Sequence, residues 1–168
     1  MIGTTALIPQ VVDAVNVPVL AAGGVMDGRG LAAVLALGAA GAQMGTAFLR
    51  ASESGAHTLL QQALLEREET ETVVTRALTG KYARGFRTTF IDQLEAGETP
   101  IPDYPIQHAL TSPLRKAAAA AMDASFMSLW AGQGHRMAAS QGAGDLVVRF
   151  AREAKGIFAR FCENSEGR

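Results

Sequence analysis

Short apolar segments alternate with helical segments near the start of the chain, and this order constrains the fold more than any other feature. Residues 17–22 lack polar alternation, which is typical of a parallel strand buried on both faces, and residues 42–45 are predicted to form a second brief strand. Helical patterns precede, separate and follow these strands. The resulting order α-β-α-β-α is typical of parallel strands joined by right-handed crossovers, so we predict an α/β fold.

The ends of the predicted helices carry local signals. Asp27 is a favourable N-cap for the second helix, and Gly38 occupies the position just after its end. Pro9 is compatible with the first turn of the first helix. The three helices are predicted over residues 7–16, over residues 28–37, and from Ser52 or Ser54 through Leu64.

Residues 67–168 differ in sequence pattern from residues 1–66. We predict that residues 1–66 form a barrel region and that residues 67–168 form a small helical region that packs on it. Ser112 and Pro113 are predicted to start an alanine-rich helix, as N-cap and first helical residue. The proline-rich residues 98–105 are predicted to form a loop. The other predicted elements are a strand over residues 72–77, a helix containing Phe90, Ile91 and Leu94 that ends before Gly97, and a last helix from about Asp145.

Composition excludes several classes of protein. Apolar residues make up 48% of the chain and charged residues 18%, which excludes disorder. The net charge of −1 provides no field to attract nucleic acid or an anionic membrane. Glycines interrupt the uncharged residues 30–49, so no membrane span is expected. The single cysteine, Cys162, permits neither an intrachain disulfide nor a cysteine-based zinc site, and we expect a cytoplasmic location and no metal.

Glycines follow both predicted strands, at the carboxyl ends where parallel α/β folds bind ligands. Gly23, Gly24 and Gly45 allow backbone N–H groups to approach an anion, and the helix after each turn adds partial positive charge. Thr46 adds a hydroxyl donor. Each turn alone is explained by tight chain reversal, but two such turns on successive strands favour a phosphate-binding cradle. The chain contains neither a Walker A motif nor a G-x-G-x-x-G motif.

Three blocks of sequence, residues 8–15, 18–30 and 41–49, closely resemble the FMN-dependent nitronate monooxygenases, formerly called 2-nitropropane dioxygenases. Residues 103–105 and 128–134 support the resemblance. The FMN-dependent enoyl-acyl-carrier-protein reductases share much of the pattern. The resemblance implies that the chain is the C-terminal portion of a TIM (β/α)8 barrel enzyme: the closing βα units, incomplete, with appended C-terminal helices.

The resemblance also implies a cofactor and a reaction. FMN would oxidise an alkyl nitronate and be re-oxidised by dioxygen, giving a carbonyl compound and nitrite. The residues that match the family's FMN contacts are Gly23, Gly24, Gln43, Met44, Gly45 and Thr46. The family's presumed catalytic base, a glycine-flanked histidine, precedes the position of Met1, so no catalytic residue is assigned and the chain alone is expected to be inactive. The alternatives are the reductase activity and a non-catalytic flavin- or phosphate-binding fragment. The expected partners are the nitronate and dioxygen, with a second copy or a missing N-terminal portion as protein partner.

The remaining candidate residues are predicted to be structural. His57, His108 and His135 are expected to be solvated or hydrogen-bonded, and Trp130 to lie in the core rather than in the flavin pocket. Cys162 is expected to be a small buried apolar residue. The solvated surface is expected to include Arg76, Lys81, Arg84, Arg87 and the acidic residues 66–71. The first strand is expected to have one edge without a partner.

Overall fold

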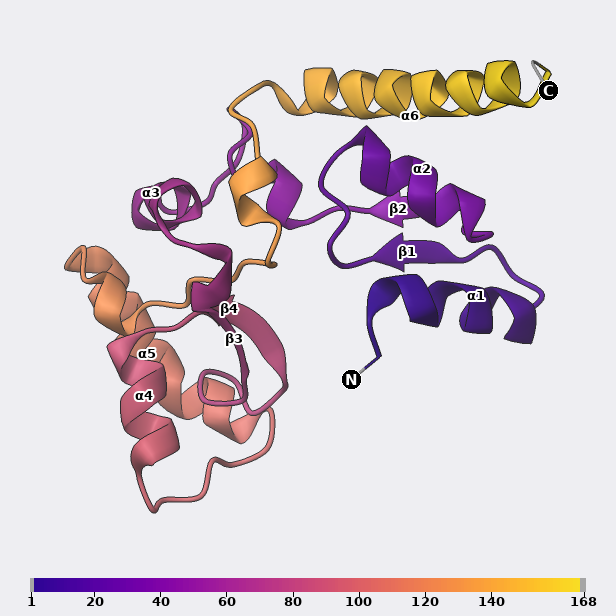
Figure 1. Cartoon of the computed structure of the whole chain (residues 1–168). Helices are drawn as coiled ribbons and strands as arrows, with labels where there is room; N and C mark the ends of the chain where they lie inside the picture. The colour runs from indigo at the N-terminus through magenta and orange to yellow at the C-terminus, as the bar shows by residue number, and fades with distance from the viewer. Residues whose placement is uncertain (1, 167–168) are drawn as a thin grey trace. The chain divides into compact units, whose positions relative to one another are not determined.

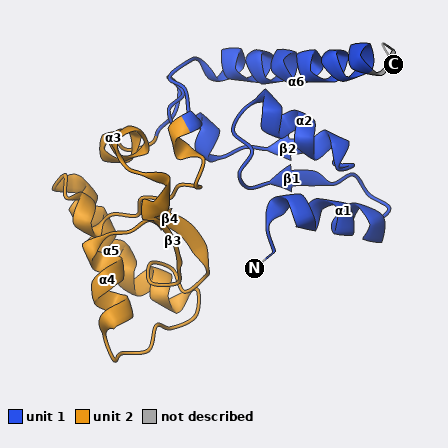
Figure 2. Cartoon of the chain, viewed as in Figure 1, with its two compact units in different colours: residues 1–55, 137–168 blue, residues 56–136 orange. Residues whose placement is uncertain are grey.

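The computed structural model describes residues 2–166, which divide into two units (Figure 2). Unit 1 comprises residues 1–55 and 137–168, and unit 2 comprises residues 56–136. These bounds differ from the expected division between residues 66 and 67. The last helix belongs to the same unit as the N-terminal α/β segment, because its apolar face packs there.

Unit 1 contains the predicted alternation of helices and strands. Its elements are α1 (Thr4–Ala14), β1 (Leu20–Ala22), α2 (Gly28–Ala36), β2 (Gly41–Gln43), the 3-10 helix η1 (Thr46–Phe48) and α6 (Ala143–Glu166). The strands β1 and β2 pair in parallel, with Leu20 opposite Gly41 and Ala22 opposite Gln43. In Figure 1 the elements follow one another in the order α6, α2, β2, β1, α1. The parallel pairing of β1 and β2 confirms the α/β class.

The sequence also predicted that the first strand of this parallel sheet has one unpaired edge. Within residues 2–166, β1 has β2 as its only neighbour in the sheet, so its other edge is unpaired, as predicted. Leu20, at the start of β1, is 62% exposed although Ala21 beside it is buried. Because successive side chains of a strand point to opposite faces, the described residues also leave the face of β1 that carries Leu20 uncovered.

The ends of α2 are those that the sequence predicts. The side chain of Asp27 accepts hydrogen bonds from the N–H groups of Arg29 (2.9 Å) and Gly30 (3.2 Å). Gly38 follows the helix with a φ of +93°, in the left-handed region that favours glycine. The start of α1 differs from its prediction, since the helix begins at Thr4 and Pro9 lies inside it rather than in the first turn. The polar first turn of α1 carries no apolar spacing that would reveal it.

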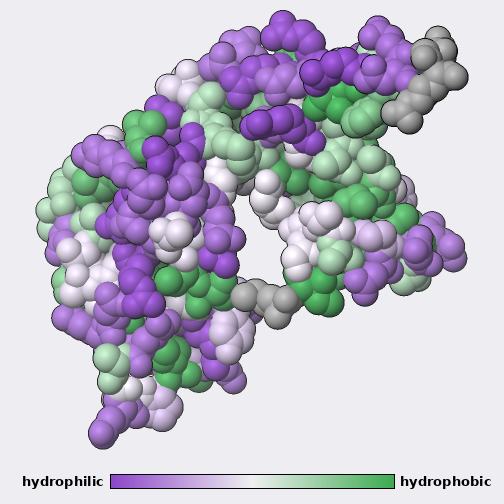
Figure 3. All heavy atoms as spheres, viewed as in Figure 1, coloured by the Kyte–Doolittle hydropathy of each residue, from purple (hydrophilic) through white to green (hydrophobic). Residues whose placement is uncertain are grey.

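Two apolar clusters form the core of unit 1. One joins α1, β1 and α2 and consists of Ile8, Ala21, Val25, Val34 and Ala39. The other joins α6 to the segment after β2 and includes Met26, Ala47, Ala51, Ala138, Leu146 and Phe150. The rings of Phe48 and Phe150 meet edge to face, with their centroids 6.1 Å apart. The outward surface of α6 is mostly hydrophilic (Figure 3), which is typical of a helix that packs through one face.

Unit 2 combines helices with a hairpin. Its elements are α3 (Thr58–Glu66), η2 (Glu69–Glu71), β3 (Thr72–Thr75), β4 (Ala83–Phe86), α4 (Thr89–Ala96), α5 (Ile106–Ala120), η3 (Ala124–Phe126) and the start of η4 (His135–Met137). The strand β3 pairs antiparallel with β4, which the sequence did not predict. One core cluster of unit 2 consists of Ala77, Leu78, Phe90 and Ile91, and Leu64, Phe86 and Leu129 are also buried in this unit. The predicted loop over residues 98–105 and the predicted helix before Gly97 are both confirmed.

The start of α5 was predicted wrongly. The helix begins at Ile106, and Pro113 therefore lies inside it instead of at its first position. Two buried polar residues account for the earlier start. Gln107 donates to the carbonyl of Ala77, and the hydroxyl of Thr111 donates to the carbonyl of Leu78 (2.6 Å). Because these residues are polar, the apolar spacing of the sequence did not reveal that this turn is buried.

No helix formed by residues 2–166 is both long enough and apolar enough to cross a membrane.

Candidate functional site

The two glycine turns leave neighbouring strands at the same end of the parallel sheet. Ala22 ends β1 and lies opposite Gln43, which ends β2. Gly23 and Gly24 follow Ala22 directly, and Met44 and Gly45 follow Gln43. Since parallel strands present their carboxyl ends to the same edge, the two predicted halves of the cradle share one end of the sheet.

The glycines of the two turns serve different purposes. Gly23 and Gly24 have φ values of +101° and +77°, which L side chains rarely adopt. Gly45 has an ordinary φ of −99°, and a Cβ atom built on it meets no atom within 4 Å. A Cβ atom built on Gly24 also meets only open space. Neither backbone conformation nor packing within the described residues therefore requires glycine at position 45, whereas close approach by a ligand would require it.

The other predicted contacts differ in exposure. Gln43 is exposed, and Thr46 is half-buried at the start of η1. The half-buried side chain of Met44 packs against both apolar clusters of unit 1. Part of the Met44 side chain is therefore used in the core of unit 1, while its backbone belongs to the turn.

The N-terminus of α2 does not offer the partial positive charge that we expected from the sequence. The N–H of Gly28 donates to Oε2 of Glu153 at 2.8 Å, and Asp27 accepts from Arg29 and Gly30. Two carboxylates thus already occupy this helix end. The turn at Gly45 leads into the three-residue 3-10 helix η1 rather than a long helix. The expected helix contribution is therefore wrong for α2, and the cradle depends on the backbone of the glycine turns.

Asp27 is held in its charged form. Burial raises its pKa, but hydrogen bonds from the Arg29 side chain and from the Gly30 N–H outweigh this effect, and the pKa of Asp27 is lowered from its ordinary value. Asp27 also forms an ion pair with Nη2 of Arg29 at 2.5 Å, so its charge is already paired and the carboxylate offers no donor to a phosphate.

The three histidines are all hydrogen-bonded within unit 2, as expected. Nδ1 of His57 accepts from the N–H of Leu59 (3.2 Å) and caps α3. His135 is fully buried, with Nδ1 3.0 Å from the carbonyl oxygen of Leu64. His108 is exposed, and its Nδ1 lies 3.2 Å from Nη2 of Arg115.

The basic residues near the hairpin contact groups of unit 2 itself. Arg76 pairs with Asp103, and Nη1 of Arg87 lies 2.5 Å from Oδ1 of Asp92. Arg84 donates to the carbonyl of Thr72 at 3.1 Å, and Nζ of Lys81 lies 4.3 Å from the centre of the Tyr104 ring. These residues lie on a strand-and-loop surface, as expected, and their contacts are intramolecular.

Two further expectations have different outcomes. Trp130 is half-buried and packs against the core cluster of unit 2, which agrees with its predicted core role. Cys162 is exposed, contrary to the expectation that it is buried. The buried face of α6 extends only as far as Ala154, and Phe161 beside Cys162 is 68% exposed.

Among the described residues, no group of histidine, cysteine and acidic side chains is arranged to hold a metal ion.

The fold of unit 1 is that of parallel α/β proteins, whose ligand sites lie at the carboxyl ends of the strands. The chain belongs to the nitronate monooxygenase family, because the sequence profile of that family matches residues 2–153.

Individual relatives agree with this assignment. A probable nitronate monooxygenase of Staphylococcus aureus (strain MSSA476) is 51% identical over 147 residues, which cover 88% of this chain. The nitroalkane oxidase of Streptomyces ansochromogenes has a TM-score of 0.88 and 49% identity, over 95% of this chain and 46% of its own. FabK from Thermotoga maritima has a TM-score of 0.81 and 30% identity, over 98% of this chain and 52% of its own. The chain spans 41% of the length of the Staphylococcus aureus relative.

Proposed function

We propose that this chain forms the FMN phosphate-binding portion of an enzyme that oxidises alkyl nitronates with dioxygen to a carbonyl compound and nitrite. Membership of the nitronate monooxygenase family supports the reaction class. The nitroalkane oxidase of Streptomyces ansochromogenes is more similar in sequence and structure than FabK, which favours nitroalkane chemistry. The single cysteine and the absence of a membrane-spanning helix among residues 2–166 are compatible with the cytoplasmic location that we propose.

The open space at Gly45 is the observation that carries the proposal. The residues proposed to hold the phosphate end of FMN are Gly23, Gly24, Gln43, Met44, Gly45 and Thr46. The two glycine turns contribute backbone groups from neighbouring strand ends, and a Cβ atom at Gly24 or Gly45 would occupy the space that a ligand needs. When bound, FMN supplies the redox chemistry, while the chain holds and orients it.

We propose that proton removal from the substrate depends on residues in the part of the family's sequence that this chain does not cover. Within residues 2–166, the side chains of the three histidines have structural contacts in unit 2. This chain is therefore proposed to anchor the cofactor and to be inactive without the remainder of the enzyme, either as a second polypeptide or as part of the same one.

The decisive experiment compares activities of a protein that combines this chain with the remainder of the family's sequence. Release of nitrite from propyl nitronate in the absence of NADH is the expected result. Oxidation of NADH in the presence of an enoyl thioester, without nitrite release, would establish the reductase alternative instead. The absorption spectrum of the 168-residue chain mixed with FMN and desalted tests the cradle separately. Retained flavin absorption with neither activity would support the non-catalytic binding fragment.

A further inference from the structure

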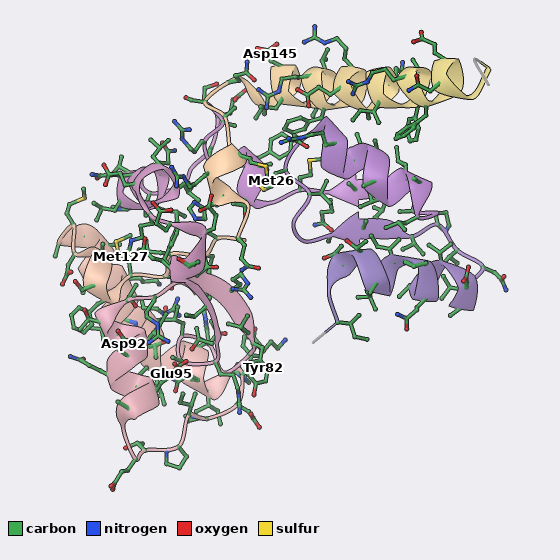
Figure 4. All side chains as sticks on the ribbon, in the orientation of Figure 1. Met26, Tyr82, Asp92, Glu95, Met127 and Asp145 are labelled. Atoms are coloured by element: carbon green, nitrogen blue, oxygen red, sulfur yellow. The ribbon has the colours of Figure 1, made fainter. Side chains whose placement is uncertain are left out.

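A pocket of unit 2 lined by basic, hydroxyl and apolar side chains lies between α5 and the segment that follows η3. Its volume is about 400 Å³. The lining residues that matter for its chemistry are His108, Ser112, Arg115, Lys116, Met127 and Ser128. Met127, which is labelled in Figure 4, is buried beside this pocket. The pocket is separate from the glycine turns, all of which belong to unit 1.

Arg115 is the central group of the pocket, and its contacts are all with uncharged acceptors. Nη1 donates to the hydroxyl of Ser128 at 2.8 Å, and Nε donates to the hydroxyl of Thr111 at 3.1 Å. Nη2 lies 3.2 Å from Nδ1 of His108. No carboxylate among residues 2–166 forms an ion pair with Arg115. Other arginines of unit 2, such as Arg76, do have such partners.

The missing counter-charge has a cost, because Arg115 is partly withdrawn from water. Burial lowers the pKa of its guanidinium from the ordinary value. A desolvated cation is stabilised most by an anion within hydrogen-bonding reach. The pocket has no aspartate or glutamate among its lining residues, and it adds the ammonium group of Lys116 and the hydroxyl of Ser112. The chemistry of the pocket therefore matches an anionic ligand.

We propose that this pocket binds the phosphate group of a small organic anion. A planar guanidinium, an ammonium group and two hydroxyls are the donors with which proteins recognise phosphate oxygens. Met127 provides an apolar wall against which the organic part of the ligand packs. A volume of about 400 Å³ exceeds what inorganic phosphate alone requires and lies within the range of small-molecule sites.

The alternative is that Arg115 only connects α5 to Ser128. In that case the pocket should not bind an added phosphate compound, and replacing Lys116 should change no binding affinity. The test uses the 168-residue chain with isotope-labelled methionine methyl groups, titrated with phenyl phosphate and followed by NMR. Binding in the pocket should shift the signal of Met127. The signal of Met44, which directly precedes Gly45 in the second glycine turn, reports separately on the proposed flavin cradle.

Substitutions distinguish the two explanations. Lys116→Gln should weaken binding of phenyl phosphate about tenfold while the fold is kept, because Lys116 is exposed. Arg115→Gln should abolish the shift of Met127, and Lys155→Gln, an exposed lysine of α6, should have no effect. The Met127 shift should persist in Gly45→Val, since that residue belongs to the other site.

Three results would each overturn the proposal. The first is a Met127 shift no larger than sodium chloride of equal ionic strength produces. The second is an unchanged affinity in Lys116→Gln. The third is equal binding of benzoate and phenyl phosphate, which would show that the pocket does not select phosphate. A failure of FMN binding at the glycine turns would leave each of these readouts unaffected.

Discussion

Glu153 accepts a hydrogen bond from the backbone N–H of Gly28, 125 positions earlier in the chain, at a distance of 2.8 Å. The contact joins the first residue of α2 to the middle of α6. A Cβ atom on Gly28 would lie 2.2 Å from Cβ of Glu153 and 2.8 Å from the backbone of Phe150 and Ala154. Glycine at position 28 therefore allows the two helices to approach closely, and the carboxylate of Glu153 satisfies a helix N–H that would otherwise lack an acceptor.

Gly28→Ala should destabilise unit 1 because the added methyl group collides with backbone atoms of α6. We expect a loss of roughly 1–3 kcal/mol in the free energy of unfolding. Urea unfolding followed by circular dichroism measures this loss. Gly156→Ala is the matched control, since a Cβ atom at Gly156, within α6, meets no atom within 4 Å. That variant should gain about 0.5–1 kcal/mol, so effects of equal sign would contradict the packing explanation.

Gly45→Val should prevent FMN retention in a protein that combines this chain with the remainder of the family's sequence. The branched side chain would fill the open space through which the phosphate approaches the backbone. Flavin absorption after desalting measures retention. Gly55→Val is the control, because a Cβ atom at Gly55 also meets only open space, but Gly55 belongs to neither glycine turn and lies between η1 and α3 in the sequence. Equal flavin content in the two variants would contradict the assignment of the FMN site to the turn at Gly45.

Asp27 should make the stability of unit 1 depend on pH under acidic conditions. Its pKa is lowered in the folded chain, so its contribution is fully present above the ordinary carboxyl pKa of about 3.9. The contribution is lost as the pH falls through the lower, folded pKa. Asp27→Asn keeps the capping oxygen and should flatten this part of the stability–pH curve, while Asp27→Ala should cost about 1 kcal/mol at neutral pH. Urea midpoints between pH 2 and 7 for the three proteins provide the test, and parallel curves for wild type and Asp27→Asn would refute it.

His135→Leu should destabilise unit 2 without affecting flavin binding. The change leaves the carbonyl oxygen of Leu64 without its partner in a buried site and removes the edge-to-face contact with Phe86. A cost of about 1–3 kcal/mol is expected. His108→Leu, at an exposed position, should change stability by no more than about 0.5 kcal/mol. Thermal unfolding measures both effects, and equal losses would contradict the structural role of His135.

Local patterns in the sequence predicted the long helices and the two strands of unit 1, although α1 begins earlier than predicted and η1 was not predicted. The apolar spacing around Ile8, the cap at Asp27 and the reversal at Gly38 all depend on residues within a few positions of one another. The same holds for the glycines that follow each strand, whose place at one end of the sheet follows from parallel pairing. Where a segment begins with buried polar residues, as α5 does at Gln107 and Thr111, the same reasoning failed.

Contacts between residues far apart in the sequence determined the features that local patterns did not predict. No local signal links Glu153 to Gly28, so the sequence predicted the Asp27 cap but not the second carboxylate at the same helix end. The exposure of Cys162 likewise depends on where the packed face of α6 ends, and the lack of a carboxylate at Arg115 depends on which elements surround it. The sequence by itself thus determined the family, the α/β alternation and the glycine turns, because these depend on short-range geometry and residue type. Only the tertiary structure decided which charges meet and which groups remain open to a ligand, since folding brings those groups together from distant parts of the chain.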